Sequence, residues 1–254
     1  AAFGPDFLPT SYTNYGPGTN ICAPGGDYSI NSTSSTPERA QILSTLPKEV
    51  GAGDYGYMQG TSMACPHVSG VVALALSYAK KLGKTFTYDE FLAMIYSSVN
   101  NIDYYIETCT KLNNGVQMDL TPFWHNMGTG AIDAWRLLMQ IEGTPCLPVQ
   151  KGTDAKIALD QYFSPAASHL TFTKVEVSED ARAALGIVGD PYVKYGKLYI
   201  RCENEGSAKI QVSAIAGGDE VAGQGTAVMG GTEFTREVSI ISREAGVAEN
   251  GGWL

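Results

Sequence analysis

The chain has 254 residues, of which 44% are hydrophobic and 17% charged, and its formal net charge is -9 at pH 7. This length and apolar fraction suit a globular protein of one large or two ordinary domains, whereas the acidic balance and the lack of a Lys/Arg-rich block exclude a nucleic-acid-binding surface. The longest apolar runs, such as residues 71–76, are far shorter than the roughly 20 residues that cross a bilayer, so we expect no transmembrane segment.

Local signals predict three helices in the first half of the chain. Between residues 68 and 82, apolar side chains recur at the i, i+3, i+4, i+7 spacing of one helix face, and Gly83 supplies a C-terminal stop. Thr87 and Glu90 form the capping-box pattern of a second helix. A third helix is predicted over residues 133–141. Loops rich in Gly, Asn and Pro, with a few short strands, connect these helices.

The pattern changes after residue 143. Residues 144–154 contain Pro and Gly and are interpreted as a linker. Over residues 155–243, apolar and polar side chains alternate in short runs separated by Gly-rich turns, which predicts an antiparallel, all-β sandwich without a helix signal of comparable strength. The Gly-rich residues 244–254 are expected to form a mobile tail. The alternating apolar residues are Ile157, Leu159, Leu170, Phe172, Val175, Val177, Leu198, Ile200, Ile210, Val212, Val238 and Ile240.

Small and polar residues stand at the first turn of the first predicted helix. A helix N-terminus presents unpaired N–H groups and the positive end of the helix dipole, so Ser62 at this place can act as a nucleophile beside a stabilised oxyanion. Gly60 lets the backbone approach a substrate, Thr61 and Met63 flank the serine, and Pro66 is tolerated in a first turn. The same residues also fit a Ser/Thr N-cap on an ordinary core helix.

The histidines offer no evident base for Ser62. His67 follows it by five positions, which at about 100° per residue places the ring roughly 140° around the helix, so we expect a structural role for His67. His125 and His169 have no motif around them and are interpreted as surface or satisfied buried residues. The carboxylates are scattered and the cysteines form no CxxC pair, so no metal cluster is predicted. These carboxylates include Asp27, Asp54, Asp103, Asp119 and Asp133.

Four stretches, in order along the chain, resemble the subtilisin-like serine peptidases. The stretch GTSMACPHVSG, residues 60–70, resembles the serine signature of that family and puts Ser62 at the nucleophile position. Residues 11–27 (SYTNYGPGTNICAPGGD), 43–47 (LSTLP) and 127–135 (MGTGAIDAW) resemble the segments around that signature. The resemblance implies an α/β fold with a mostly parallel, doubly wound sheet.

The resemblance covers about residues 1–143 and implies that they are the C-terminal part of a subtilisin-like catalytic domain. In subtilases the triad runs Asp, His, Ser, and the Asp motif, the His-Gly-Thr motif and the oxyanion-hole asparagine all precede the segment matched by residues 11–27. None of these is present in this chain. We therefore expect a missing N-terminal half of the domain to supply the Asp and the His, and the chain alone to be inactive on peptide or protein substrates. The resemblance also implies secretion, or attachment to a bacterial cell envelope, with the signal region outside this chain.

The resemblance bears on cysteines and cofactors as well. Cys22 and Cys65 occupy positions that suit small buried residues, so we expect free core thiols there. Cys109 lies in a region, residues 100–126, that looks longer than in a minimal subtilase, and a bridge from it to Cys146 is conceivable. No cofactor is evident. Calcium is common in the family, but the sequence offers no ligand set for it.

Two other functions remain open. Residues 155–243 resemble, less specifically, immunoglobulin-like or cadherin-like modules, so a catalytically inactive protein could bind or adhere through this sandwich. An α/β-hydrolase that uses Ser62 with His125 is disfavoured, because the site reads G-T-S-M-A instead of G-x-S-x-G and the preceding DYGYMQ makes a poor central strand.

Overall fold

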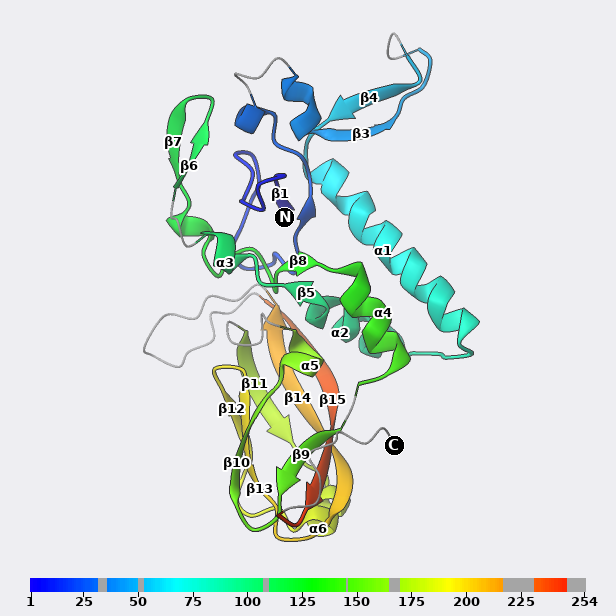
Figure 1. The fold of residues 1–254 in the computed structure, drawn as a ribbon, viewed down its shortest axis with the longest axis vertical. Coiled ribbons are helices and arrows are strands. Elements are labelled where there is room, and N and C mark those ends of the chain that lie inside the picture. The colour runs from blue at the N-terminus through cyan, green and yellow to red at the C-terminus, as the bar shows by residue number, and fades with distance from the viewer. Residues whose placement is uncertain are drawn as a thin grey trace.

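The computed structural model describes residues 1–31, 36–49, 53–106, 110–144, 146–164, 170–216 and 231–245. The molecule is elongated, with helices and small sheets of the N-terminal part at one end and the C-terminal strands at the other (Figure 1). Cys109 and His169 lie outside the described residues, as does the predicted tail from residue 246 onward.

Four short strands form the centre of the N-terminal part. β1 (Ala2–Phe3) pairs in parallel with β2 (Ala23–Pro24), and β5 (Val99–Asn100) pairs antiparallel with β8 (Ala131–Ile132). A parallel bridge between Cys22 and Ala131 joins the two pairs. Segments from both ends of this part therefore lie side by side.

Two antiparallel hairpins extend from this centre (Figure 1). They are β3 (Ile42–Thr45) with β4 (Tyr55–Met58), and β6 (Thr110–Asn113) with β7 (Val116–Asp119). Asn114 and Gly115 have φ values of 50° and 80°, as a tight two-residue hairpin turn requires. Strands joined by short turns must be antiparallel. The mixed α/β content agrees with the prediction. Within the described residues of this part, parallel pairing is limited to β1 with β2 and to the bridge between Cys22 and Ala131, so the sheets are small and the mostly parallel, doubly wound sheet stays a prediction.

The three predicted helices are confirmed, and the first begins earlier than its apolar pattern indicated. The helices of this part are α1 (Thr61–Lys81), α2 (Tyr88–Ser97), α3 (Asp103–Ile106) and α4 (Ala134–Glu142), with the 3-10 helices η1 (Tyr28–Asn31), η2 (Pro37–Ala40) and η3 (Thr121–Phe123). Thr87 and Glu90 form the predicted capping box of α2, and the Asp133 side chain caps α4. The three long helices share a core of Ala75, Ala79, Phe91, Met94, Ile95, Leu137 and Ile141.

Helix α1 leaves much of its surface exposed. Its buried side chains are Ala64, Ala75 and Ala79, whereas Leu74 and Leu76 are about half exposed. With 21 residues it is the one helix among the described residues that is long and apolar enough to cross a membrane, and only 17% of its most apolar window is buried. Small residues interrupt the apolar runs of this helix without making the helix polar. For this reason the short apolar runs did not indicate a helix of membrane-spanning length. Length and composition alone do not separate a membrane span from the core helix of a soluble protein.

The C-terminal part forms two sheets. Its elements are β9 (Leu147–Gln150), β10 (Asp154–Ala158), α5 (Asp160–Phe163), β11 (Thr171–Glu176), α6 (Glu179–Leu185), β12 (Tyr192–Lys194), β13 (Lys197–Arg201), β14 (Gly206–Ala216) and β15 (Thr232–Arg243). One sheet has the strand order β11-β14-β15-β9 and the other β10-β13-β12. The pairings are antiparallel, except that β9 runs parallel to β15.

Two features depart from the predicted all-β sandwich and its linker. Helix α6 is capped at its start by Ser178, whose side chain accepts a hydrogen bond from Ala181 N, and at its end by Gly186 in the left-handed conformation. These start and stop signals are local, but the apolar alternation of the surrounding residues predicted strands alone. Strand β9 lies inside the predicted linker because Leu147 and Val149 are buried against the sheet. The prediction of a part without helices is therefore wrong.

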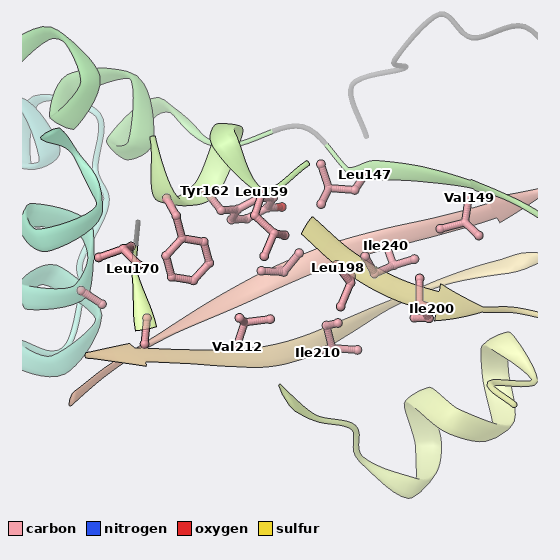
Figure 2. Packing of buried hydrophobic residues seen from close by; sticks show 14 of the residues in the cluster. Leu147, Val149, Leu159, Tyr162, Leu170, Leu198, Ile200, Ile210, Val212 and Ile240 are labelled. Carbon is pink, nitrogen blue, oxygen red and sulfur yellow. The ribbon is translucent and has the colours of Figure 1, made fainter. Parts of the chain in front are cut away.

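The two sheets enclose a common core (Figure 2). Leu198 and Ile200 of β13 belong to the same buried cluster as Ile210 and Val212 of β14. Ala93 of α2 is fully buried in this cluster too. The core of the C-terminal part thus continues into the helices of the N-terminal part.

Strand β15 attaches the C-terminal part to α2 and α4. Arg236 is buried, and its guanidinium donates a hydrogen bond of 2.9 Å to Ser97 Oγ and another to Gln140 Oε1. The rings of Tyr96 and Phe234 meet edge to face with centroids 5.7 Å apart. Burial lowers the pKa of Arg236 to about 10, because it disfavours the charged guanidinium.

Candidate active site

Ser62 is the second residue of α1, and its side chain is exposed. The helix is capped by Gly60, whose φ is 147° and whose carbonyl accepts hydrogen bonds from Met63 N (2.9 Å) and Ala64 N (3.2 Å). The N–H groups of Thr61 and Ser62 are left without a partner among the described residues. Free donors at the positive end of a helix dipole suit an anion that forms beside the serine.

The residues before Ser62 are anchored to the loop that follows β2. Gly60 N donates to Gly25 O at 3.0 Å, and Tyr28 N donates to Gln59 Oε1. A Cβ atom on Gly25 would lie 2.9 Å from Gly60 O, so this close approach of two backbones requires glycine. The start of α1 is therefore positioned by residues more than thirty places earlier in the chain.

Two further residues of the predicted motif lie along α1. His67 Nδ1 is 2.7 Å from Met63 O, one turn earlier, so the imidazole contacts the backbone of its own helix. Pro66 lies inside α1 and not in its first turn as predicted, because the helix already begins at Thr61. Proline has no N–H, so the carbonyl of Ser62, four residues earlier, lacks its usual helical donor.

Among the described residues no base contacts the hydroxyl of Ser62, which has no hydrogen-bond partner there. His125 is bonded to Asp103 instead: Nδ1 lies 2.9 Å from Oδ2, and the His125 backbone N donates to Oδ1 at 3.0 Å. The Trp124 ring stacks on the imidazole with centroids 4.6 Å apart. The pairing of Ser62 with His125 that an α/β-hydrolase would need is absent. Sequence reasoning missed the His125–Asp103 pair because no motif links residues 22 positions apart.

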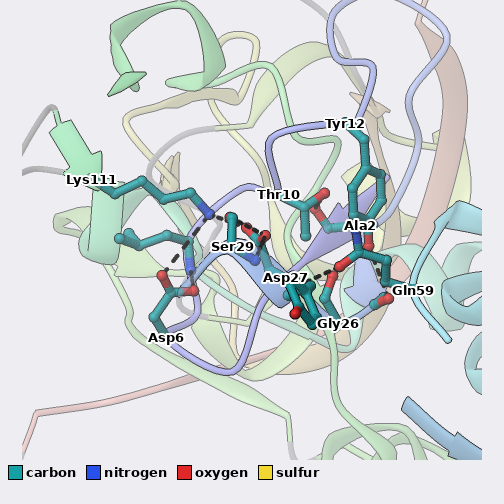
Figure 3. A network of polar contacts seen from close by, with 12 residues as sticks. Ala2, Asp6, Thr10, Tyr12, Gly26, Asp27, Ser29, Gln59 and Lys111 are labelled. Atoms are coloured by element: carbon teal, nitrogen blue, oxygen red, sulfur yellow. Dashed lines mark hydrogen bonds and ion pairs between the residues drawn. The ribbon is translucent and has the colours of Figure 1, made fainter. Parts of the chain in front are cut away.

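A buried ion pair next to the site was also missed (Figure 3). Lys111 Nζ lies 2.6 Å from Asp27 Oδ2 and 4.0 Å from Asp6 Oδ2. Asp27 is fully buried, and Ser29 donates to its other carboxylate oxygen through both its backbone N, at 3.2 Å, and its hydroxyl. Burial raises the pKa of Asp6, and the nearby ammonium of Lys111 opposes that shift.

The described cysteines are free thiols in different surroundings. Cys22 is buried, which raises the pKa of its thiol to about 12. Cys65 is exposed on the uncovered face of α1, which corrects the expectation of a core thiol. Cys146 is a free thiol, and Cys109, the other cysteine of the conceivable bridge, lies outside the described residues. Within the described ranges, no three His, Cys, Asp or Glu side chains come together in a group that could hold a metal ion.

Parts of the chain resemble known proteins. Residues 6–116 match Peptidase S8, the subtilase family. The chain is 32% identical over 123 residues to the "Extracellular basic protease" of Dichelobacter nodosus, which covers 48% of this chain and 16% of that protein. It is 35% identical over 111 residues to "Pyrolysin" of Pyrococcus furiosus, a match that covers 42% of this chain and 7% of that protein. It is 41% identical over 71 residues to an "Extracellular protease" of Xanthomonas campestris pv. campestris, a match that covers 27% of this chain and 10% of that protein.

The chain thus spans between 7% and 16% of the length of these relatives. No solved structure matches it. Ser62 and the loop that anchors it lie within the matched residues 6–116. The match to the subtilase family thus concerns residues 6–116, and the three relatives are each similar to part of this chain.

Proposed function

We propose that this chain carries the nucleophile of a secreted, subtilisin-like serine endopeptidase. The observation that carries the proposal is the exposed Ser62 on the first turn of α1, inside the segment that matches the subtilase family. Two relatives bear the name of extracellular proteases, which supports secretion. In this proposal the C-terminal sheets form an immunoglobulin-like or cadherin-like module appended to the catalytic domain.

In the proposed reaction, Ser62 Oγ attacks the scissile carbonyl carbon of a peptide and forms first a tetrahedral intermediate and then an acyl-enzyme. A histidine takes the hydroxyl proton and passes it to the leaving amine, and an aspartate orients that histidine. The N–H of Ser62, which has no partner among the described residues, donates to the oxyanion. Water then hydrolyses the acyl-enzyme.

We propose that the histidine and the aspartate come from a part of the protein outside residues 1–254. The support for this is that the Ser62 hydroxyl has no basic partner among the described residues. The same part would cover the exposed face of α1, where Leu74 and Leu76 are about half exposed. Covering apolar surface is favourable by about 25 cal/mol per Å², so this face supplies a driving force for the two parts to associate.

A fluorophosphonate, which reacts with activated serines, tests the proposal. The full-length protein that contains this chain should be labelled, and Ser62→Ala should abolish the label. Residues 1–254 alone should react at least about 10³-fold more slowly, because a serine without its base is a weak nucleophile. Ser69→Ala is the matched control, since Ser69 lies on the same helix and its hydroxyl contacts Cys65 O.

Three results would contradict the proposal in different ways. A label that persists in Ser62→Ala would show that the activated serine is a residue other than Ser62. Absence of any label on the full-length protein would favour the alternative, a binding or adhesive function of the C-terminal part. Labelling of residues 1–254 at the full-length rate would show that no additional base is needed.

A further inference from the structure

The β6–β7 hairpin is attached to the rest of the protein through a charged side chain. Lys111 is the buried residue of β6, and no residue of β7 is buried. Leu112 and Val116 of the same hairpin are about two-thirds exposed. An apolar side chain at position 111 would be the ordinary way to pack such a hairpin, so the buried ammonium needs its own explanation.

Asp27, the partner of Lys111, has every oxygen occupied. Lys111 Nζ lies 2.6 Å from Oδ2, while Oδ1 accepts two hydrogen bonds from Ser29. The Asp27 backbone N donates to Ala40 O at 2.8 Å. A buried ion pair is often no more stable than a well-packed apolar pair, because both ions lose hydration. Such a pair does, however, hold its two partners in one defined arrangement.

The position of Asp27 determines where α1 begins. Gly25 accepts a hydrogen bond from Gly60 N, and Tyr28 donates one to Gln59. These two anchors stand on either side of Asp27 in the chain, and the residues they hold directly precede the first turn of α1. A shift of Asp27 would therefore move the start of that helix.

We propose that Lys111 is a positioning residue for Ser62: its ion pair with Asp27 holds the loop of residues 25–28, and that loop holds the start of α1. This inference rests on the function proposed above. A nucleophile displaced by about 1 Å loses up to about 100-fold in rate, so losing the pair should slow acylation by about 10- to 100-fold. The KM for a peptide ester should stay unchanged, since Lys111 touches the loop and not the substrate.

The test measures kcat and KM for a peptide ester, the rate of fluorophosphonate labelling, and the melting temperature, all on the full-length protein. Lys111→Met should lower kcat and the labelling rate. The separate variant Lys111→Arg, which keeps the positive charge, should retain most of both. Asp27→Asn combined with Lys111→Met removes both charges of the buried pair and leaves only Asp6, whose side chain is 25% exposed, without the ammonium, so it should regain most of the melting temperature while acylation stays slow. Lys209→Met, which removes an exposed lysine of β14 paired with Glu237, should change none of these quantities.

The outcomes separate this inference from the proposed function. If the double variant regains both the melting temperature and the rate, the pair is only structural and the inference is wrong. Equal labelling rates in Lys111→Met and the unchanged protein would likewise overturn it alone. No labelling of the unchanged protein would overturn the proposed function, and this inference with it. If Lys111→Met does not fold, the double variant decides the question.

Discussion

At the scale of single residues, Gly128 shows how tightly the N-terminal part is packed. Its φ is 78°, and a Cβ atom there would lie 2.4 Å from the backbone carbon of Asn20. Gly128→Ala should therefore lower the free energy of unfolding by about 3–5 kcal/mol, through strain and a clash that backbone cannot relieve. Gly115, with φ of 80° and open space around it, is the control, and Gly115→Ala should cost only about 1–2 kcal/mol. Urea unfolding measures both, and equal losses would show that the contact with Asn20 does not matter.

At the scale of elements, the capping box of α2 makes the stability of this helix depend on pH. Hydrogen bonds from the backbone N and, to a lesser extent, the hydroxyl of Thr87 lower the pKa of Glu90 below its usual 4.5. The contribution of these bonds to stability is therefore complete above pH 4.5, and it is lost as the pH falls through the lower pKa of the folded state. Thr87→Ala should cost about 1 kcal/mol at pH 7 and less at about pH 3. Thermal unfolding at both pH values checks this against Thr85→Ala, which should be neutral. A cost that grows on acidification would contradict it.

At the scale of the whole molecule, Arg236 couples the C-terminal sheets to α2 and α4. Arg236→Met removes the hydrogen bonds to Ser97 and Gln140, but Ser97 keeps a bond to Ala93 O and Gln140 one to Gln161 O. Removing a buried charge offsets part of the loss, so we expect a net cost of about 1–2 kcal/mol. Hydrogen exchange should show α2, α4, β14 and β15 opening together in the unchanged protein, and the two helices opening more easily in the variant. Arg201→Met, at a partly exposed arginine of β13, should preserve joint opening. Separate opening in the unchanged protein would refute the coupling.

The sequence by itself determined the features that depend on near neighbours in the chain. The capping box at Thr87, the helix over about residues 133–141 and the place of Ser62 at a helix start were predicted, because each depends on residues within one or two helical turns. Helix α6 has equally local signals, from Ser178 to Gly186, so it too could have been predicted from the sequence.

Only the tertiary structure decided which charged groups meet. Lys111 pairs with Asp27 across 84 residues, and Arg236 reaches Ser97 across 139. The pairing of β9 with β15 likewise places a stretch predicted as linker inside a sheet. The cost of burying a charge depends on every group that surrounds it, and those groups are brought together by the packing of the whole chain, so no local pattern could have indicated these contacts.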